Sequence, residues 1–134
     1  MIDIELDVYD ACARRVLDKY PDCLTTSMNV DAPASFPAVS ISEAVNRLDV
    51  SRCDSSGREN AAIVNYDVKV FSNLKTGARS QAKKLLQIVD EYLTSMNFRR
   101  TVKTQGESVK DPSIYRITAR YTASVDKSGK ISRR

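Results

Sequence analysis

The chain has 134 residues and a mass of 14.9 kDa, which suits one domain with a modest core rather than two domains. Its 42% hydrophobic and 28% charged residues are evenly spread, which excludes a disordered tail, and no apolar run approaches the roughly 18 residues of a membrane-spanning helix. The net charge of +4 is unevenly placed, because acids are in surplus over the first 50 residues and bases over the last 40.

A helix is predicted over the first twenty residues. Apolar and aromatic side chains recur there at helical spacing and would form one buried stripe. Acids near its start suit the positive end of the helix dipole, and Pro21 ends it. A short strand is expected between Cys23 and Val30, before a turn that contains Pro33 and Pro37. The predicted stripe consists of Ile2, Leu6, Tyr9, Ala13, Val16, Leu17 and Tyr20.

A long β-hairpin is predicted next. Two alternating runs, 38–48 and 62–70, flank a polar segment, 49–60, that is rich in turn-forming residues. This segment exceeds the two to five residues of an ordinary hairpin loop, a length typical of functional or disordered loops. On the first strand Val39, Ile41 and Val45 are expected to share the apolar face, which Glu43 interrupts. On the second strand that face would carry Ala62, Val64, Tyr66, Val68 and Val70.

A second amphipathic helix and two strands complete the predicted elements. Asn97 is expected to cap the helix, and strands at 98–104 and 114–125 follow, joined by a turn at 105–112. In the last strand Tyr115, Ile117 and Tyr121 alternate with polar residues that include Arg116 and Arg120. The helix stripe consists of Ala78, Ala82, Leu85, Leu86, Val89, Leu93 and Met96, and most of its charged residues face away: Arg79, Lys83, Lys84, Asp90 and Glu91.

This order of elements predicts an α+β fold over residues 1–134. We expect a largely antiparallel or mixed sheet of four to five strands, with both helices packed on one face and a long hairpin. A flexible loop is expected at 49–60 and a basic end at 126–134. The second face of the sheet would be polar and free to meet a partner.

The sequence offers little for catalysis. Histidine is absent, which removes the commonest general base and the usual partner of a Ser or Cys nucleophile. The four glycines are scattered singly, so no phosphate-binding loop is indicated. We therefore expect a protein that is not an enzyme and that has no cofactor and no metal site.

The number of cysteines and the composition of the N-terminal residues indicate the cellular compartment. An odd number of cysteines without a CxxC pair predicts free thiols in a reducing environment: Cys12, Cys23 and Cys53. Acids stand where a signal peptide would be basic and then apolar, at Asp3, Glu5, Asp7 and Asp10. Synthesis without export, and no membrane partner, are expected.

Non-specific nucleic-acid binding is the alternative function. Lys69, Arg116 and Arg120 are expected on the polar face of the sheet, where they suit a phosphate backbone. The aromatic residues Tyr66, Tyr115 and Tyr121 share the apolar parity of their strands and should face the helices instead. Little would then remain on the polar face to stack on bases.

Four runs, SFPAVSISEA, DSSGRENAAIVNYDVKVFSN, MNFRR and IYRITARYTASVDKSGKISRR, occur along the chain in this order. Together with the lysine-bearing second helix they resemble the tail terminator, or tail completion, proteins of long-tailed bacteriophages, of the kind found in phages and prophages of Gram-positive bacteria. The resemblance covers the chain from about Tyr9 to Arg134.

The resemblance implies a structural virion protein with a helix-flanked sheet. Six copies would form a ring that caps the finished tail tube, ends tube polymerisation and presents a surface to the head connector. In a contractile tail the ring would also contact the last layer of sheath protein, so a phage-tail-like bacteriocin particle suits the chain equally well. The implied location is the neck end of the virion tail, after assembly in the host cytoplasm, with DNA only passing through the lumen.

The residues acquire expected roles from this resemblance. The loop would contact the tail tube through Arg52, Asp54, Arg58 and Glu59. A closed ring needs two different complementary surfaces on each copy, and the uneven charge distribution could supply them. Basic residues of one copy would pair with acids of the next at an interface made by Asp7, Asp10, Glu43, Arg99, Arg100, Arg116 and Arg120.

Overall fold

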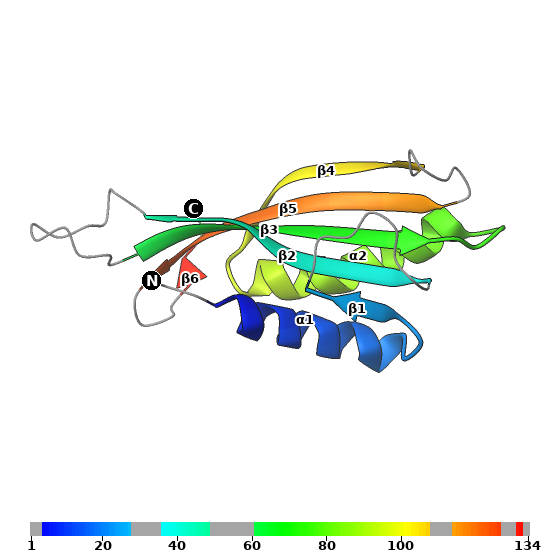
Figure 1. The fold of residues 1–134 in the computed structure, drawn as a ribbon, viewed down its shortest axis with the longest axis horizontal. Helices are drawn as coiled ribbons and strands as arrows, with labels where there is room; N and C mark the ends of the chain where they lie inside the picture. The colour runs from blue at the N-terminus through cyan, green and yellow to red at the C-terminus, as the bar shows by residue number, and fades with distance from the viewer. Residues whose placement is uncertain (1–3, 28–35, 49–60, 108–113, 127–130, 133–134) are drawn as a thin grey trace, which may run out of the picture.

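The fold is a mixed β-sheet that carries two helices on one face (Figure 1). The computed structural model describes residues 4–27, 36–48, 61–107, 114–126 and 131–132. Within these residues the predicted α+β class is confirmed, with its two helices, its long hairpin and its largely antiparallel sheet. The predicted loop at 49–60 lies outside the described residues.

The strands follow an order that differs from the chain order. From one edge to the other the order is β1 (Leu24–Thr26), β2 (Ala38–Leu48), β3 (Ala61–Ser72), β5 (Tyr115–Asp126) and β4 (Arg99–Glu107). Among the described strands, β1 and β2 run parallel and the other neighbours run antiparallel. The short strand β6 (Ile131–Ser132) also pairs with β5, beside Ser124 and Val125. The hairpin β2–β3 therefore occupies the middle of the sheet.

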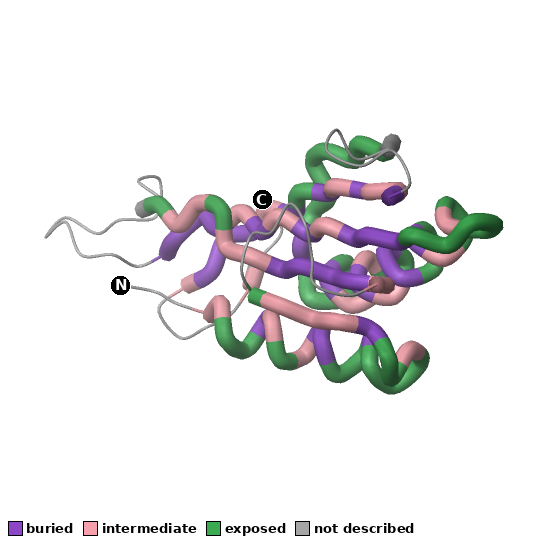
Figure 2. Tube along the Cα trace, turned by 45° about the vertical axis from the view of Figure 1, so that its right-hand side comes forward, coloured by how far each residue is buried: buried purple, intermediate pink, exposed green. Residues whose placement is uncertain are grey.

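Both helices cover the same face of the sheet, which we call the helix face. Helix α2 (Ala78–Ser95) contacts β3, β5 and β4, while α1 (Glu5–Lys19) contacts β2 and α2. The main core lies between these layers, and Figure 2 shows buried residues along the central strands and the inner sides of the helices. In the described part of the chain, neither helix is long and apolar enough to cross a membrane.

Helix α1 buries only part of the predicted stripe, whose Val16 lies in the core as predicted. Val8, Cys12 and Val16 are at most 5% exposed, whereas Leu6 is 70% and Leu17 38% exposed. The prediction that Leu6 and Leu17 belong to the core is therefore wrong. The helix is turned toward the sheet and α2 together, and only one side of it meets both neighbours.

Helix α2 matches its prediction more closely. Ala82, Leu85, Leu86, Val89 and Leu93 are buried, as their 3.6-residue periodicity requires. Met96 lies just past the last turn and is 39% exposed, so its predicted place in the core is wrong.

Asn97 ends α2 as predicted. Its φ of 69° is left-handed, a conformation that Asn tolerates better than most residues. The next amide, of Phe98, donates to the Leu93 carbonyl at 2.9 Å, and the Asn97 amide donates to the Thr94 carbonyl at 3.1 Å. These two bonds close the helix end, and the buried Phe98 leads the chain into β4.

A β-bulge in β2 changes which residues face the helices. Before the bulge, Ile41 faces Val68 and Glu43 faces Tyr66; after it, Val45 faces Asn65 and Asn46 faces Val64. Cross-strand partners share a face of the sheet. The prediction that Val45 shares the face of Val39 and Ile41 is therefore wrong, because the extra residue at Ala44 reverses the alternation.

The predicted alternation of β3 and β5 is confirmed. Val64, Tyr66, Val68 and Val70 are fully buried on the helix face. Their partners on β5 are also buried: Ala123, Tyr121, Ala119 and Ile117, in the same order. The Tyr66 ring meets Phe98 edge to face, with centroids 5.6 Å apart, so aromatic contacts reinforce this central layer.

The ends of several strands differ from prediction. Strand β1 stops at Thr26 within the described residues, and β4 continues to Glu107 instead of turning at 105. The basic end predicted at 126–134 is partly built into the sheet, because Ile131 and Ser132 form β6. The Asn97 side chain donates to the Ile131 carbonyl at 3.2 Å and so links β6 to the end of α2.

Candidate assembly surfaces

The face of the sheet opposite the helices, which we call the open face, carries a polar ladder. Arg120 on β5 donates to Asp67 on β3 twice, Nε to Oδ1 at 2.9 Å and Nη2 to Oδ2 at 3.3 Å. One step along, the Thr122 hydroxyl donates to Asn65 Oδ1 at 2.7 Å. The bond to Asp67 raises the pKa of Arg120, so this guanidinium stays charged.

The open face is also basic. Its side chains follow from the strand register, since odd-numbered residues of β3 from Ala61 to Phe71 point away from the helices. Two described carboxylates lie on this face, Asp67 and Asp126, against five described bases: Arg47, Lys69, Arg99, Arg116 and Arg120. The face therefore suits an anionic or acidic partner.

One part of the open face is apolar and covered. Phe71, Ala38 and Ile114 form a small cluster against which Leu24 and Phe36 pack. Phe71 is fully buried although it shares the parity of Asp67 and Lys69. Only part of the open face can therefore meet a partner.

Three of the predicted interface residues have partners within the chain. Arg100 Nη1 donates to Asp90 on α2 at 3.2 Å, and Arg120 is held by Asp67. Glu43 accepts bonds from the Tyr66 hydroxyl at 3.4 Å and from Asn46 at 3.3 Å. Pairing of these residues with a second copy stays a prediction, and it would compete with these bonds.

The other predicted interface residues lie on opposite parts of the molecule. Asp7 and Asp10 are exposed on α1. Arg99 is exposed on the outer strand β4, and Arg116 is half-buried on the open face. The predicted tube-contact residues, Arg52, Asp54, Arg58 and Glu59, lie outside the described residues.

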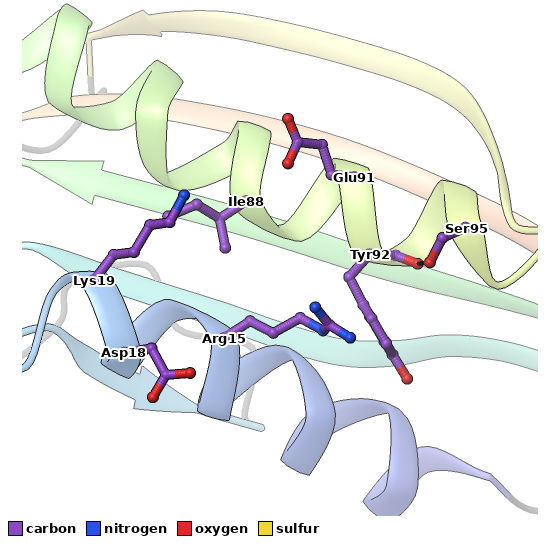
Figure 3. Close-up of a pocket in the computed structure, with 7 residues that line it drawn as sticks. All are labelled: Arg15, Asp18, Lys19, Ile88, Glu91, Tyr92 and Ser95. Carbon is purple, nitrogen blue, oxygen red and sulfur yellow. Dashed lines mark hydrogen bonds between the residues drawn. The ribbon is translucent and has the colours of Figure 1, made fainter.

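A groove runs between the two helices on the outer surface of the molecule. A hollow of about 320 Å³ is lined by Arg15, Asp18, Lys19, Ile88, Glu91, Tyr92 and Ser95. Figure 3 shows Arg15 reaching from α1 toward Tyr92 of α2, and the guanidinium carbon lies 4.5 Å from the ring centroid. This cation–π contact joins the helices, so part of the groove serves the fold. No sequence pattern indicated this contact, because it depends on how the two helices pair.

The buried titratable groups lie in the core rather than in a hollow. Burial raises the pKa of the Cys12 thiol from 9.0 to about 12 and that of Cys23 to about 11, so both are protonated near neutrality. The buried Tyr121 hydroxyl donates to Asp90 Oδ1 at 2.7 Å, and burial together with this bond raises the Tyr121 pKa. Among the described residues no group of His, Cys, Asp or Glu could hold a metal ion.

The tyrosines weighed for base stacking face the helices, as predicted. Tyr66 and Tyr121 are fully buried, and the half-buried Tyr115 packs against the main core. A stacking surface would need exposed rings. These three residues do not supply one.

Comparison with known proteins yields no match to any protein-family model and none to any curated protein sequence.

Proposed function

We propose that this chain is a structural, non-enzymatic tail terminator of a long-tailed phage or of a related phage-tail-like particle. Copies of it would form a six-membered ring at the neck end of the tail. The ring would cap the tail tube, end its polymerisation and join the tail to the head connector, and it would also meet the sheath in a contractile particle. The ordered sequence runs that resemble such proteins support this proposal, as does a sheet flanked by helices on one face.

The observation that carries the proposal is the position and length of the β2–β3 hairpin. Its two strands have 11 and 12 residues, and their pairing runs from Ala38 opposite Phe71 to Leu48 opposite Ala62. On its other side β3 pairs with β5 along its whole length. A stem held on both sides keeps Leu48 and Ala61, the described residues that flank segment 49–60, at one end of the sheet (Figure 1).

This arrangement suits a protein that must place one polar segment against a large partner. The segment is too long for a simple hairpin turn, and it carries both signs of charge at its tip. In the proposed ring each copy would present this tip to the last layer of tube subunits through Arg52, Asp54, Arg58 and Glu59. The rigid stem would fix the tip while the ring closes.

Removing the tip tests the proposal. Deletion of Ser51–Glu59 in the gene should leave the monomer folded, because the hairpin register and the core lie elsewhere, yet it should abolish capping. Electron micrographs of the producing strain should then show tails of irregular, extended length without attached heads. A Gly-Ser linker of the same length is the matched control for loop closure, and it should give the same defect. Tails of normal length from both variants would refute the role of the tip.

Non-specific nucleic-acid binding is the second candidate, favoured by the five bases on the open face. Its test is retention of duplex DNA at increasing salt, because phosphate contacts give a steep salt dependence. Replacing Arg47 and Arg116 with Ala should flatten that dependence, whereas replacing Arg79 and Lys83 on α2 should not. Equal retention by both variants, or none by the wild type at low salt, would reject this candidate.

A further inference from the structure

The side of α1 that points away from α2 is exposed and partly apolar. Leu6, Asp10 and Leu17 share this side, because their spacings of four and eleven residues return to one side of a helix. Arg15 follows Leu6 by nine residues, and Lys19 follows Asp10 by nine. Nine residues are about two and a half turns, so Arg15 and Lys19 lie on the opposite side of the helix and line the groove toward α2. With the neighbouring Asp7 we call Leu6, Asp10 and Leu17 the α1 flank. Its leucines are 70% and 38% exposed.

Strand β4 offers a surface of opposite charge. Its described side chains, from Arg99 to Gln105, are all exposed, and among them are three bases and no acid. Val102 is 51% exposed on the open face, where it lies opposite Arg120. Arg100 is already bonded to Asp90, which leaves Arg99 and Val102 on the open face and Lys103 on the helix face, opposite Ala119. These three exposed residues, on the two sides of the outer strand, make up the surface that we call the β4 edge.

The two surfaces lie on opposite long sides of the molecule. Strand β4 ends the described sheet on one side, and β1 ends it on the other. Helix α1 accompanies β1, because the Tyr9 hydroxyl donates to Thr25 Oγ1 at 3.3 Å. Figure 1 shows α1 and β1 along the lower side and β4 along the upper side. One copy can therefore use both surfaces at once, each toward a different neighbour.

We infer that the α1 flank of one copy docks on the β4 edge of a second copy. Asp7 and Asp10 meet the bases Arg99 and Lys103, while the exposed leucines meet Val102. Such a contact removes apolar side chains from water on both copies. It also covers the outermost strand of the described sheet, and an edge strand left uncovered invites unspecific pairing. Opposite charges across the contact also fix which surface meets which.

The contact is heterologous, since two different surfaces of the same chain meet. Repeated from copy to copy, it forms a closed ring if the rotation closes and an open filament if it does not. The inference rests on the proposed ring, and it names the surfaces that build it.

Complementation between two charge-reversed variants tests the inference. Variant one carries Asp7→Lys and Asp10→Lys, which disables the α1 flank; variant two carries Arg99→Glu and Lys103→Glu, which disables the β4 edge. In sedimentation experiments at several concentrations, the association constant of each variant alone should be at least roughly tenfold lower than that of the wild type. Mixed in equal amounts they should recover association, because the new lysines on the α1 flank of variant one face the new glutamates on the β4 edge of variant two, and the native pair of surfaces also remains. Arg79→Glu with Lys83→Glu on α2 is the matched control and should associate like the wild type.

Zero-length cross-linking provides a second measurement on the unaltered protein. A carbodiimide joins a carboxylate to a lysine amine in direct contact, so it should link Asp7 or Asp10 to Lys103. Mixed isotope-labelled and unlabelled copies show by mass spectrometry whether the link joins two copies. The variant Lys103→Arg keeps the charge, and it should retain association while losing the cross-link.

The outcomes separate this inference from the proposed function. A ring that forms normally from each charge-reversed variant alone, or a wild type that neither associates nor cross-links at high concentration, overturns the docking. Variant tails of normal length, together with weak association of each variant alone and its recovery on mixing, would leave the docking standing and count against the capping function. Irregular tails from each variant alone, with association recovered on mixing the two proteins, support both.

Discussion

The two faces of the sheet are built from the same strands, yet different forces hold them. On the helix face, Val64, Tyr66, Val68 and Val70 are fully buried, and each such apolar side chain contributes about 1.5–3 kcal/mol by leaving water. On the open face, Asp67 and Arg120 form a hydrogen-bonded pair whose side chains are 20% and 44% exposed, and such pairs typically contribute about 0–1 kcal/mol. The helix face therefore holds the fold, and the open face can change partners at little cost in stability.

Two β-bulges change which face of the sheet the side chains of a strand occupy. The bulge in β2 moves Val45 to the open face, and a second one in β4 separates Arg100, opposite Tyr121, from Val102, opposite Arg120. The β4 bulge thus sends Arg100 toward Asp90 and leaves Val102 exposed. Each bulge makes one strand serve both the core and a surface.

The largest difference between the faces should appear on truncating a core leucine. Leu93→Ala removes a fully buried side chain of α2 from the core on the helix face, which should lower the free energy of unfolding by about 2–5 kcal/mol. Thr118→Ala on the open face is the control, with an expected change within about 0.5 kcal/mol. Urea unfolding measures both. Similar losses from the two substitutions would contradict the division between the faces.

The second largest change in stability is expected on removing the polar contact buried on the helix face. Asp90→Ala leaves the buried Tyr121 hydroxyl without its carboxylate acceptor and releases Arg100, which should cost about 1–3 kcal/mol. Adding Tyr121→Phe removes the stranded hydroxyl, so the double variant should be less destabilised than the sum of the two single variants. Strict additivity would mean that the bond adds nothing to stability.

The buried thiols predict a loss of stability at alkaline pH. A thiol whose pKa is higher in the folded protein keeps its proton while the unfolded chain loses its own, so its contribution is fully present below about pH 9. The contribution then declines as the pH rises toward about 11 for Cys23 and about 12 for Cys12. At pH 10 the loss should be about 1 kcal/mol for each thiol. Urea titrations at pH 8 and 10 on the wild type and on Cys12→Ala should show a smaller pH-dependent loss in the variant.

The smallest effect is expected from the ion pair on the open face. A double-mutant cycle of Asp67→Ala and Arg120→Ala should give a coupling of about 0.2–1 kcal/mol that decreases with added salt. A coupling well above 2 kcal/mol would show that the open face helps to hold the fold, and the comparison of the two faces would then fail.

Prediction from sequence succeeded for elements whose hydrophobic residues follow one periodicity and pack against one neighbouring layer. The strand alternation of β3 and β5 and the stripe of α2 were correct, because each of these elements buries a single face. It failed in part for α1, where Leu6 and Leu17 fit the same periodicity as the buried Val16 but are exposed, while Val8 and Cys12, which were not predicted, are buried. The bulge in β2 was not predicted, because an extra residue leaves no mark in the hydrophobic pattern. Strand β6 was not predicted either, because two residues are too few to show a pattern.

The sequence by itself determined the fold class, the strands of the hairpin and the inward parity of the tyrosines, since these depend on local periodicity and on the burial of apolar side chains. Tertiary structure alone decided which side of α1 stays exposed, which bases of the sheet are held by Asp67 and Asp90, and that the α1 flank and the β4 edge lie on opposite sides. These features depend on strand order and on the rotation of a helix about its own axis. Both are set by contacts between residues far apart in the chain, which no local pattern records.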